Sequence, residues 1–251
     1  MTVAAMTQVA LVTGGSQGLG SDIARALHAA GYRVAVCDVD EAAALARART
    51  LDPDGATADG YDLDVREQAN FERVRDALLE RWGSIEVLVN NAAITAAQPV
   101  LDITPDEFDA VLAVNLRGTF IGSQVLGRHF KSKGYGRIVN IASLAGQNGG
   151  TATGAHYAAS KGAILTLTKV FARDLAAFGV TVNAVAPGPL DLPSVRRTVP
   201  TDRLAELIKA IPVGTLGDPA YVADVVVRLA APEAGFTTGA TWDINGGLSM
   251  R

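Results

Sequence analysis

Short runs of β-branched and other apolar residues alternate along the chain with longer segments that have a helical pattern. The short runs are bounded by Gly, Asn, Asp or Pro, which is typical of strands buried inside a sheet. Six of them predict strands at 9–13, 33–38, 85–90, 137–142, 180–186 and 240–245, and a weaker seventh is expected at 56–64. The longer segments predict helices at 19–30, 41–51, 66–81, 105–131, 155–178 and 219–230.

This regular alternation implies right-handed crossovers and a parallel sheet covered by helices on both faces, which is an α/β class of fold. Thr104 is expected to cap the 105–131 helix, with Pro105 at its first position. The sequence has no internal repeat, low-complexity tract or linker, so we expect residues 1–251 to form one domain.

The composition has 49% hydrophobic residues and 26 glycines, as expected for a large core with many tight turns. A net charge of −4 and a pI near 5.4 argue against nucleic acid or an anionic membrane as a main partner. No apolar stretch reaches the roughly 18 residues of a membrane span, and residues 1–7 lack a signal-peptide pattern. The one cysteine, Cys37, excludes an intrachain disulfide and is expected in the core. We therefore expect a soluble cytoplasmic protein without a metal site.

A glycine-rich turn follows the first predicted strand and leads directly into the first helix. Glycines allow a tight turn and the close approach of a pyrophosphate, while the helix N-terminus adds N–H groups and a favourable dipole. The spacing G-x-x-x-G-x-G differs from the dinucleotide fingerprint G-x-G-x-x-G, and a plain strand-to-helix connection is the alternative. The position at the first junction favours phosphate binding, with Gly14, Ser16, Gln17, Gly18, Leu19 and Gly20 as the candidate residues.

An acidic residue, Asp38, ends the second predicted strand about 20 residues after the glycine turn. Its carboxylate can accept both ribose hydroxyls of adenosine. The alternative is that it caps the next helix, but Asp40 is better placed for that task. A 2′-phosphate would be repelled by Asp38, Asp40 and Glu41 together, and Gln17 in the turn is neutral. The expected cofactor is therefore NAD rather than NADP.

Tyr157 and Lys161 lie four residues apart near the start of a predicted helix, so that they share one face. An exposed tyrosine beside a solvated lysine is the alternative to a catalytic pair. Reduction of a ketone needs a proton at oxygen as hydride reaches carbon, and the reverse reaction needs a base. A lysine ammonium and a positive nicotinamide would both lower the tyrosine pKa from its usual value of about 10. The pair predicts a general acid and base.

Two more polar residues are candidates for the same site. Ser143 follows the strand at 137–142, at the carboxyl edge where ligands bind in such sheets, and its hydroxyl could hold a substrate oxygen against Tyr157. Asn115 interrupts an apolar helix, and a buried Asn needs partners. One use would be to bind water that connects Lys161 to solvent. An ordinary loop serine and a satisfied core amide are the respective alternatives.

Together these features resemble the short-chain dehydrogenase/reductase family over essentially the whole chain. The tetrad of Asn115, Ser143, Tyr157 and Lys161 contributes most, with further matches at 90–92 and 239–247. The resemblance implies a three-layer, Rossmann-like, doubly wound sheet in the order 3-2-1-4-5-6-7, and a homotetramer built through the two long helices and the C-terminal strand. It also implies cofactor contacts from Tyr157 and Lys161 and from Asp64, Val65, Asn91, Ala92, Pro187, Gly188 and Leu190.

Within the family, the segment 211–219 and the last strand are most similar to 3-oxoacyl-carrier-protein reductases. Those enzymes mostly use NADPH and carry a basic residue where this chain has Gln17. Two positions depart from the family pattern. Ala93 stands where glycine is common, and Leu192 replaces the threonine that usually binds the nicotinamide carboxamide. Ser194, or backbone groups at Leu190, are the candidates to replace that threonine.

The leading hypothesis is an NAD-dependent dehydrogenase that interconverts a small secondary alcohol and its ketone. Thioesters of 3-oxoacyl groups with acyl carrier protein or CoA are the second substrate class, and a non-catalytic NAD-binding sensor is an alternative of another kind. The segments 145–156 and 189–212 are expected to shape the substrate pocket, the second as a lid. Its basic residues either meet a phosphopantetheine or carboxylate or form a solvated helix face: Arg196, Arg197, Arg203 and Lys209.

Overall fold

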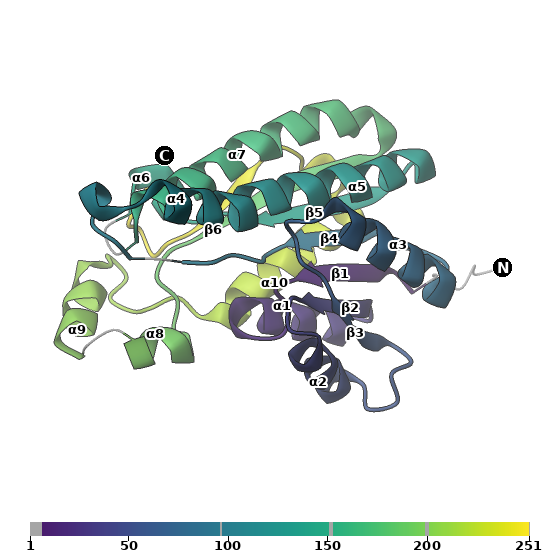
Figure 1. Ribbon diagram of the computed structural model, residues 1–251, viewed down its shortest axis with the longest axis horizontal. Coiled ribbons are helices and arrows are strands. Elements are labelled where there is room, and N and C mark those ends of the chain that lie inside the picture. Colours follow the sequence, from purple (N-terminus) through teal and green to yellow (C-terminus); the bar gives the residue numbers. More distant parts are fainter. Residues whose placement is uncertain (1–6, 96, 151–152, 199–200, 251) are drawn as a thin grey trace.

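The computed structural model describes residues 7–95, 97–150, 153–198 and 201–250, without the side chains at 194, 198 and 202. Seven parallel strands form one sheet in the order β3-β2-β1-β4-β5-β6-β7 (Figure 1). The expected three-layer α/β fold and its strand order are confirmed. The strands are β1 (Val9–Thr13), β2 (Arg33–Asp38), β3 (Ala58–Asp62), β4 (Val87–Asn90), β5 (Gly136–Ile141), β6 (Val180–Pro187) and β7 (Thr241–Ile244).

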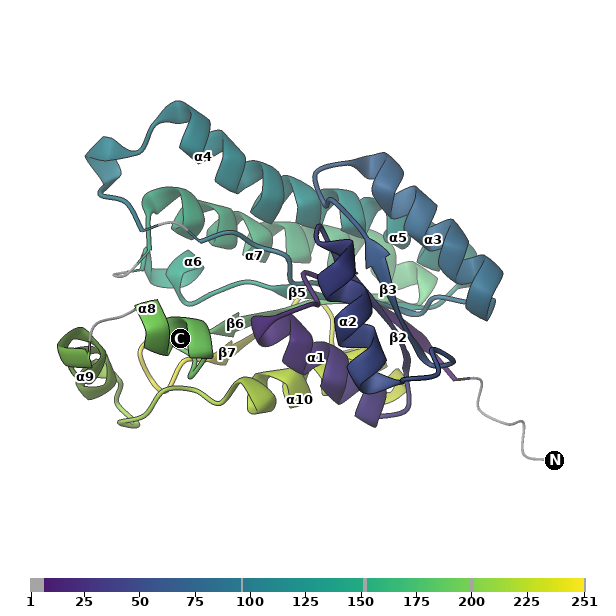
Figure 2. The ribbon, with the colours of Figure 1, turned by 60° about the horizontal axis from the view of Figure 1, so that its bottom comes forward.

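Helices cover both faces of the sheet, because successive strand residues point to opposite sides. In β1, Ala10 and Val12 pack with α1, α2 and α10, whereas Leu11 packs with α3, α5 and α7 on the other face. Figure 2 shows these two helical layers on either side of the strands. The first layer contains α1 (Gly18–Ala29), α2 (Glu41–Leu51) and α10 (Pro219–Ala230), and the second contains α3 (Gln68–Trp82), α4 (Pro105–Leu112), α5 (Gly118–Lys133) and α7 (Ala155–Leu175).

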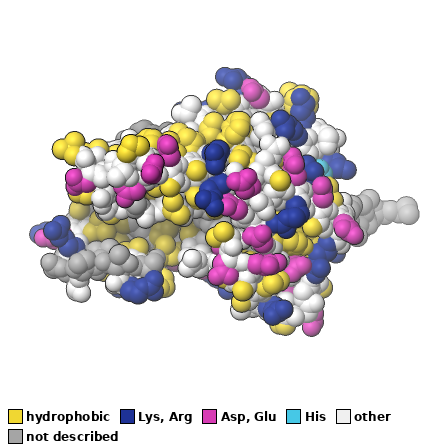
Figure 3. All heavy atoms as spheres, viewed as in Figure 1, with side chains coloured by type: hydrophobic (Ala, Val, Ile, Leu, Met, Phe, Trp, Pro, Cys, Tyr) yellow, Lys and Arg dark blue, Asp and Glu magenta, His cyan; other side chains and the backbone are white. Residues whose placement is uncertain are grey.

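Three shorter helices gather at the carboxyl ends of the strands: α6 (Ala145–Asn148), α8 (Pro193–Thr198) and α9 (Thr201–Ala210). In Figures 1 and 2, α8 and α9 lie at the end of the molecule opposite the N-terminus. They occupy the segment 189–212 that was expected to form a lid. Figure 3 shows a hollow lined with hydrophobic side chains between α4 and the α8–α9 region, and charges of both signs scattered over the rest of that face.

Most predicted boundaries agree with the structure to within two residues, but the helix predicted at 105–131 is not α-helical throughout. It consists of α4, a π-helical turn at Ala113–Arg117 and α5, and it extends to Lys133. The helix predicted at 155–178 ends as α7 at Leu175 and continues as a 3-10 turn, Ala176–Phe178. Both predicted caps are confirmed: Asp40 accepts from the Ala43 N–H, and Thr104 forms a reciprocal capping box with Glu107. Cys37 is fully buried, as expected.

The contact between α6 and α7 depends on glycine. A Cβ at Gly146 would lie 2.5 Å from the backbone N of Gly162 and 2.5 Å from the carbonyl carbon of Lys161. Such distances are far below van der Waals contact, so the backbones can approach this closely only without a side chain. The contact holds the segment after β5 against the helix that carries Tyr157 and Lys161.

Gly146→Ala is therefore expected to push α6 away from α7, to destabilise the fold by about 1–3 kcal/mol and to reduce turnover. The matched control is Gly162→Ala, on the opposite side of the same contact. Its Cβ would lie 3.1 Å from the Gly146 carbonyl oxygen, and alanine has a better helix propensity, so its effect should be smaller. Urea unfolding gives both free energies, and an unchanged value for Gly146→Ala would refute the packing argument.

Candidate functional site

The glycine turn after β1 is fixed to the segment that follows β4. Asn91 Nδ2 donates to the carbonyl oxygens of Thr13 and Gly14, both at 3.0 Å. Thr13 Oγ1 in return accepts from the N–H groups of Asn91 and Ala92 at 3.0 and 3.1 Å. Gly14 has φ +60°, and a Cβ there would lie 2.8 Å from Ala92 Cα. Position 14 therefore requires glycine. Asn91 contributes to this site by fixing the shape of the glycine turn.

The start of α1 fits an anion. The N-cap residue Gln17 makes no side-chain capping bond, and the first turn holds no acidic residue. Gly18, at φ +54°, has nothing within 4 Å of an added Cβ. The N–H groups of Leu19 and Gly20 belong to this uncapped first turn, where the helix dipole favours negative charge. The turn therefore has the shape and polarity that a pyrophosphate requires.

Asp38 lies beside this turn. Its Oδ2 accepts from Ser16 Oγ at 2.5 Å and from the Ser16 N–H at 3.3 Å, and its Oδ1 accepts from the Asp40 N–H at 3.4 Å. Asp38 does not cap α2, since Asp40 has that role. A carboxylate thus stands at the end of β2 next to the phosphate turn, where the adenosine ribose was expected.

Two residues expected near the adenine have protein partners. Asp64 forms an ion pair with Arg66 at 2.5 Å, and hydrogen bonds from Arg66 hold the pKa of Asp64 below its usual value. Val65 is 7% exposed and packs directly against Gly118. A Cβ at Gly118 would lie only 2.7 Å from the Val65 side chain. Val65 therefore forms part of the contact with the start of α5.

Tyr157 and Lys161 share one side of α7, with Lys161 Nζ 5.7 Å from the centre of the Tyr157 ring. Lys161 is 2% exposed, and its Nζ donates to the Ile141 carbonyl oxygen at 2.6 Å. Burial lowers the pKa of Lys161 from 10.5 to about 8, because it disfavours the charged ammonium. The lysine is thus a buried cation next to the tyrosine rather than a solvated surface group.

The pKa of Tyr157 departs from the sequence-based expectation. Burial raises it, and hydrogen bonds with the side chains of Ser143 and Thr95 act in the opposite direction. Lys161 was expected to lower this pKa, but in the protein alone its ammonium is engaged with the Ile141 carbonyl group. The structure does bring Ser143 and Tyr157 together. Sequence reasoning missed Thr95, whose only signal was a hydroxyl in the loop after the fourth strand.

Asn115 is fully buried in the π-helical turn. Its Oδ1 accepts from the Ile94 N–H at 2.9 Å, and its Nδ2 donates to the Ile94 carbonyl oxygen at 3.0 Å and to Ser160 Oγ at 3.1 Å. All the described hydrogen bonds of this amide are therefore to other protein groups. This is what we expected if Asn115 is a satisfied core amide rather than a water-binding residue. π turns inside helices often occur at functional sites, and this one carries an amide that fixes the loop after β4.

Backbone hydrogen bonds hold the end of β6 and the segment after it in place. Pro187 accepts from the Leu144 N–H at 2.9 Å, and the Gly188 N–H donates to Ile244 at 2.8 Å. Leu190 is 7% exposed and pairs with Gly217, and Leu192 packs against the same apolar core. Leu192 thus has a packing role here. The side chain of Ser194, the candidate replacement for the missing threonine, lies outside the described residues.

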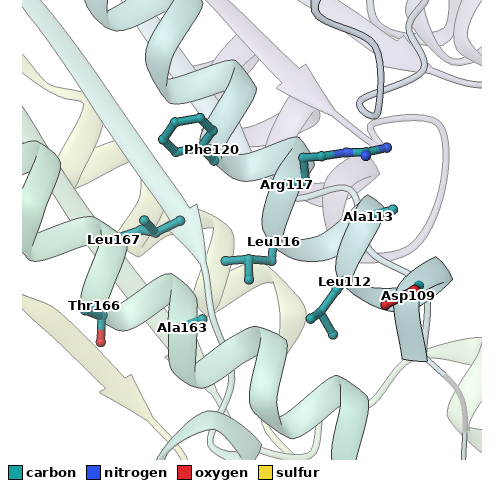
Figure 4. Close-up of a pocket in the computed structure, with 9 residues that line it drawn as sticks. All are labelled: Asp109, Leu112, Ala113, Leu116, Arg117, Phe120, Ala163, Thr166 and Leu167. Atoms are coloured by element: carbon teal, nitrogen blue, oxygen red, sulfur yellow. The ribbon is translucent and has the colours of Figure 1, made fainter. Parts of the chain in front are cut away.

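A hollow of about 770 Å³ lies away from these groups, between the α4–α5 region and α7 (Figure 4). Ala163 and Leu167 line this hollow from α7. The buried Lys161 lies on another side of the same helix. Its lining is largely apolar and consists of Asp109, Leu112, Ala113, Leu116, Arg117, Phe120, Ala163, Thr166 and Leu167. The hollow is therefore separate from the site around Tyr157.

The described residues contain neither a membrane-spanning helix nor a metal-binding cluster. No helix in this part of the chain is both long enough and apolar enough to cross a membrane. Nor do the described His, Cys, Asp and Glu side chains form a group of three or more that could hold a metal ion.

Known proteins resemble this chain along nearly its whole length. The model of the family described as "Enoyl-(Acyl carrier protein) reductase" matches residues 14–249. An acetoacetyl-CoA reductase of Shinella zoogloeoides is 42% identical over 245 residues, which cover 96% of this chain and 98% of that protein. A 3-oxoacyl-(acyl-carrier-protein) reductase of Vibrio cholerae is 37% identical over 243 residues, covering 97% and 98%.

A solved structure agrees with these relatives. The crystal structure of a short chain dehydrogenase from Bacillus anthracis matches with a TM-score of 0.88 at 28% identity, covering 97% of each chain. The shared fold, the family match and the two reductases give one conclusion: the chain belongs to the short-chain dehydrogenase/reductase family of oxidoreductases and is similar to its 3-oxoacyl-carrier-protein reductases.

Proposed function

We propose that the protein interconverts a secondary alcohol and a ketone by hydride transfer with NAD(H), and that Tyr157 is the general acid and base. The observation that carries this proposal is the approach of Tyr157, Ser143 and the buried Lys161 at the carboxyl edge of the sheet. The edge also holds the uncapped start of α1, which fits the cofactor pyrophosphate. A non-catalytic NAD sensor would not need a buried lysine beside a tyrosine.

Each residue has a separate task in this reaction. The nicotinamide supplies or takes up the hydride. Ser143 donates a hydrogen bond to the substrate oxygen and holds it against Tyr157. In reduction, the Tyr157 hydroxyl gives its proton to that oxygen, and in oxidation the phenolate takes the proton back. The Lys161 ammonium stabilises the phenolate electrostatically.

The substrate of the leading hypothesis is a small hydroxy or oxo compound. The second candidate, a 3-oxoacyl thioester, gains support from the acetoacetyl-CoA and 3-oxoacyl reductases among the relatives. The hollow lined with hydrophobic side chains between α4 and the α8–α9 region would suit an acyl chain (Figure 3). A parallel screen of small alcohols, polyols and 3-oxoacyl thioesters, followed by NADH absorbance, would separate the two classes.

We also propose a homotetramer in which α5 and α7 pack against a second copy of the chain. Phe120 and Val170 are 39% and 37% exposed on these helices, and the Phe120 and Phe171 rings lie 5.9 Å apart. The apolar hollow of Figure 4 continues the same surface. Exposed apolar surface of this kind is typical of an interface.

Tyr157→Phe removes the proton donor and leaves the ring in place. We expect turnover to fall by about 10²- to 10⁴-fold, while NADH affinity, followed by its fluorescence, stays close to that of the parent. Tyr135→Phe is the matched control, since the Tyr135 hydroxyl accepts from Gln8 Nε2 at the other end of the sheet. Full activity of Tyr157→Phe on a good substrate would remove Tyr157 from the mechanism.

For the cofactor, we expect a higher catalytic efficiency with NADH than with NADPH. Asp38→Asn should reduce efficiency with NADH by about ten- to a hundredfold, because it removes charge-assisted hydrogen bonds to the ribose. Asp40→Asn removes the same charge two residues away and keeps a good N-cap, so it should change the NADH efficiency little. A clear NADPH preference of the parent would contradict the role given to Asp38.

Phe120→Glu should break the proposed contact between copies, because it places a charge on the apolar surface of α5. Sedimentation velocity should then report a smaller assembly than for the parent. Val39→Glu is the control: Val39 is 69% exposed in the turn between β2 and α2. If Phe120→Glu and the parent have the same mass, this surface is not the interface.

A further inference from the structure

We propose that Ser160 is a positioning residue for Tyr157: its buried hydroxyl ties the first turn of α7 to the π turn that carries Asn115. This inference deepens the proposed function, because it rests on Tyr157 as the general acid and base. Ser160 stands directly before Lys161 and three residues after Tyr157, and its side chain is fully buried. A hydroxyl in such a place needs partners inside the protein.

A directional series of hydrogen bonds passes through Ser160. The Ile94 N–H donates to Asn115 Oδ1 at 2.9 Å and Asn115 Nδ2 donates to the Ile94 carbonyl oxygen at 3.0 Å, so only one orientation of the amide makes both bonds. The other N–H of Nδ2 donates to Ser160 Oγ at 3.1 Å. Because Ser160 Oγ accepts this bond, its own proton goes to the Tyr157 carbonyl oxygen at 2.7 Å. The loop after β4, the π turn and the backbone of Tyr157 are thereby joined.

The first turn of α7, which carries Tyr157, begins at an N-cap glycine. Gly154 has no side chain with which to cap the helix, and helix ends open more readily than helix centres. The Tyr157 N–H donates to His156 Nδ1 at 3.0 Å, whereas the Tyr157 carbonyl oxygen accepts from Ser160 Oγ. Both backbone groups of Tyr157 are thus held by side chains, which fixes the direction in which its phenol leaves the helix.

The bond between Ser160 and Asn115 lies where water cannot replace it, since both side chains are fully buried. Removing the Ser160 hydroxyl would leave one N–H of the Asn115 amide without its acceptor, which costs more than the loss of an exposed hydrogen bond. The amide would then have to move to find another partner. Because the same amide holds Ile94, its movement would loosen the loop after β4 together with the first turn of α7.

The same helix contains a second buried hydroxyl with the same bonding pattern. Thr168 Oγ1 accepts from Asn140 Nδ2 at 3.0 Å and donates to the Ile164 carbonyl oxygen at 2.8 Å. Thr168 and Asn140 are both fully buried. Thr168 lies seven residues after Lys161, which is about two helical turns. Thr168→Val therefore removes an equivalent hydroxyl from α7 without touching the turn that carries Tyr157.

The first measurement is amide hydrogen exchange of the folded protein at single-residue resolution, which needs no substrate. In Ser160→Ala we expect the N–H groups of Ile94 and Tyr157 to exchange about three- to tenfold faster than in the parent. Ser160→Cys keeps a weaker donor of similar size and should lie between these two proteins. Thr168→Val should leave both N–H groups at the exchange rate of the parent. Parent-like exchange of Ile94 in Ser160→Ala overturns the inference.

The second measurement is steady-state kinetics with a substrate accepted by the parent. In Ser160→Ala kcat should fall about three- to tenfold while KM and NADH affinity stay close to those of the parent, because alignment for proton transfer changes rather than binding. Thr168→Val should keep the kcat of the parent. Equal losses of kcat in the two variants would leave Ser160 with a structural role only and overturn the inference. Activity retained by Tyr157→Phe would instead remove the proposed function, and the exchange result would not change.

Discussion

All seven strands run in the same direction, so every connection crosses back over a face of the sheet and every strand delivers its carboxyl end to the same edge. That constraint gathers the glycine turn after β1, Asp38 at the end of β2, the Asn91 loop after β4 and Ser143 after β5. It also explains Gly14. Because β1 and β4 are neighbours, the turn meets the Ala92 backbone directly, and a Cβ has no room there. The polar site therefore results from strand order rather than from proximity in the sequence.

The buried Lys161 makes this edge energetically unfavourable for the protein alone. A pKa lowered from 10.5 to about 8 corresponds to a cost of about 3 kcal/mol for holding the ammonium in the folded state. The folded-state pKa is depressed, so this cost is fully present below pH 8 and disappears as the pH rises towards the unfolded value of 10.5. Burial disfavours the Tyr157 phenolate as well. The two charged forms stabilise each other when both are present, so we expect their titrations to be coupled.

The sequence predicted the features that depend on periodicity and local chemistry. The strands, the long helices and the caps at Asp40 and Thr104 follow from patterns within a few residues, and the structure confirms them. Asn115 stood out as a polar residue in an apolar helix, but the π turn around it could not be predicted, because the helical pattern of the sequence continues through 113–117. The partners of Asn115 lie 21 and 45 positions away in sequence, at Ile94 and Ser160. Such contacts depend on where the loop after β4 crosses α7, which a single sequence does not specify.

The relatives support the type of reaction more strongly than they support the residues that bind the two ends of the ligands. The reason lies in how each group is held in the fold. Tyr157, Lys161 and Ser143 are held by packed elements. In the proposed function, the adenosine end would depend on one side chain, Asp38, and the substrate end on the segment containing α8 and α9. In that segment Asp191 binds Arg196 through two hydrogen bonds at 2.5 and 2.6 Å, so this arginine's charge is already compensated. Any recognition of an anionic handle on the substrate would then fall to the exposed cations that follow it on α8 and α9, which are Arg197, Arg203 and Lys209. If the proposed thioester is the substrate, these three cations are the candidates to meet its phosphate, whereas a small uncharged alcohol would leave them as a solvated helix face.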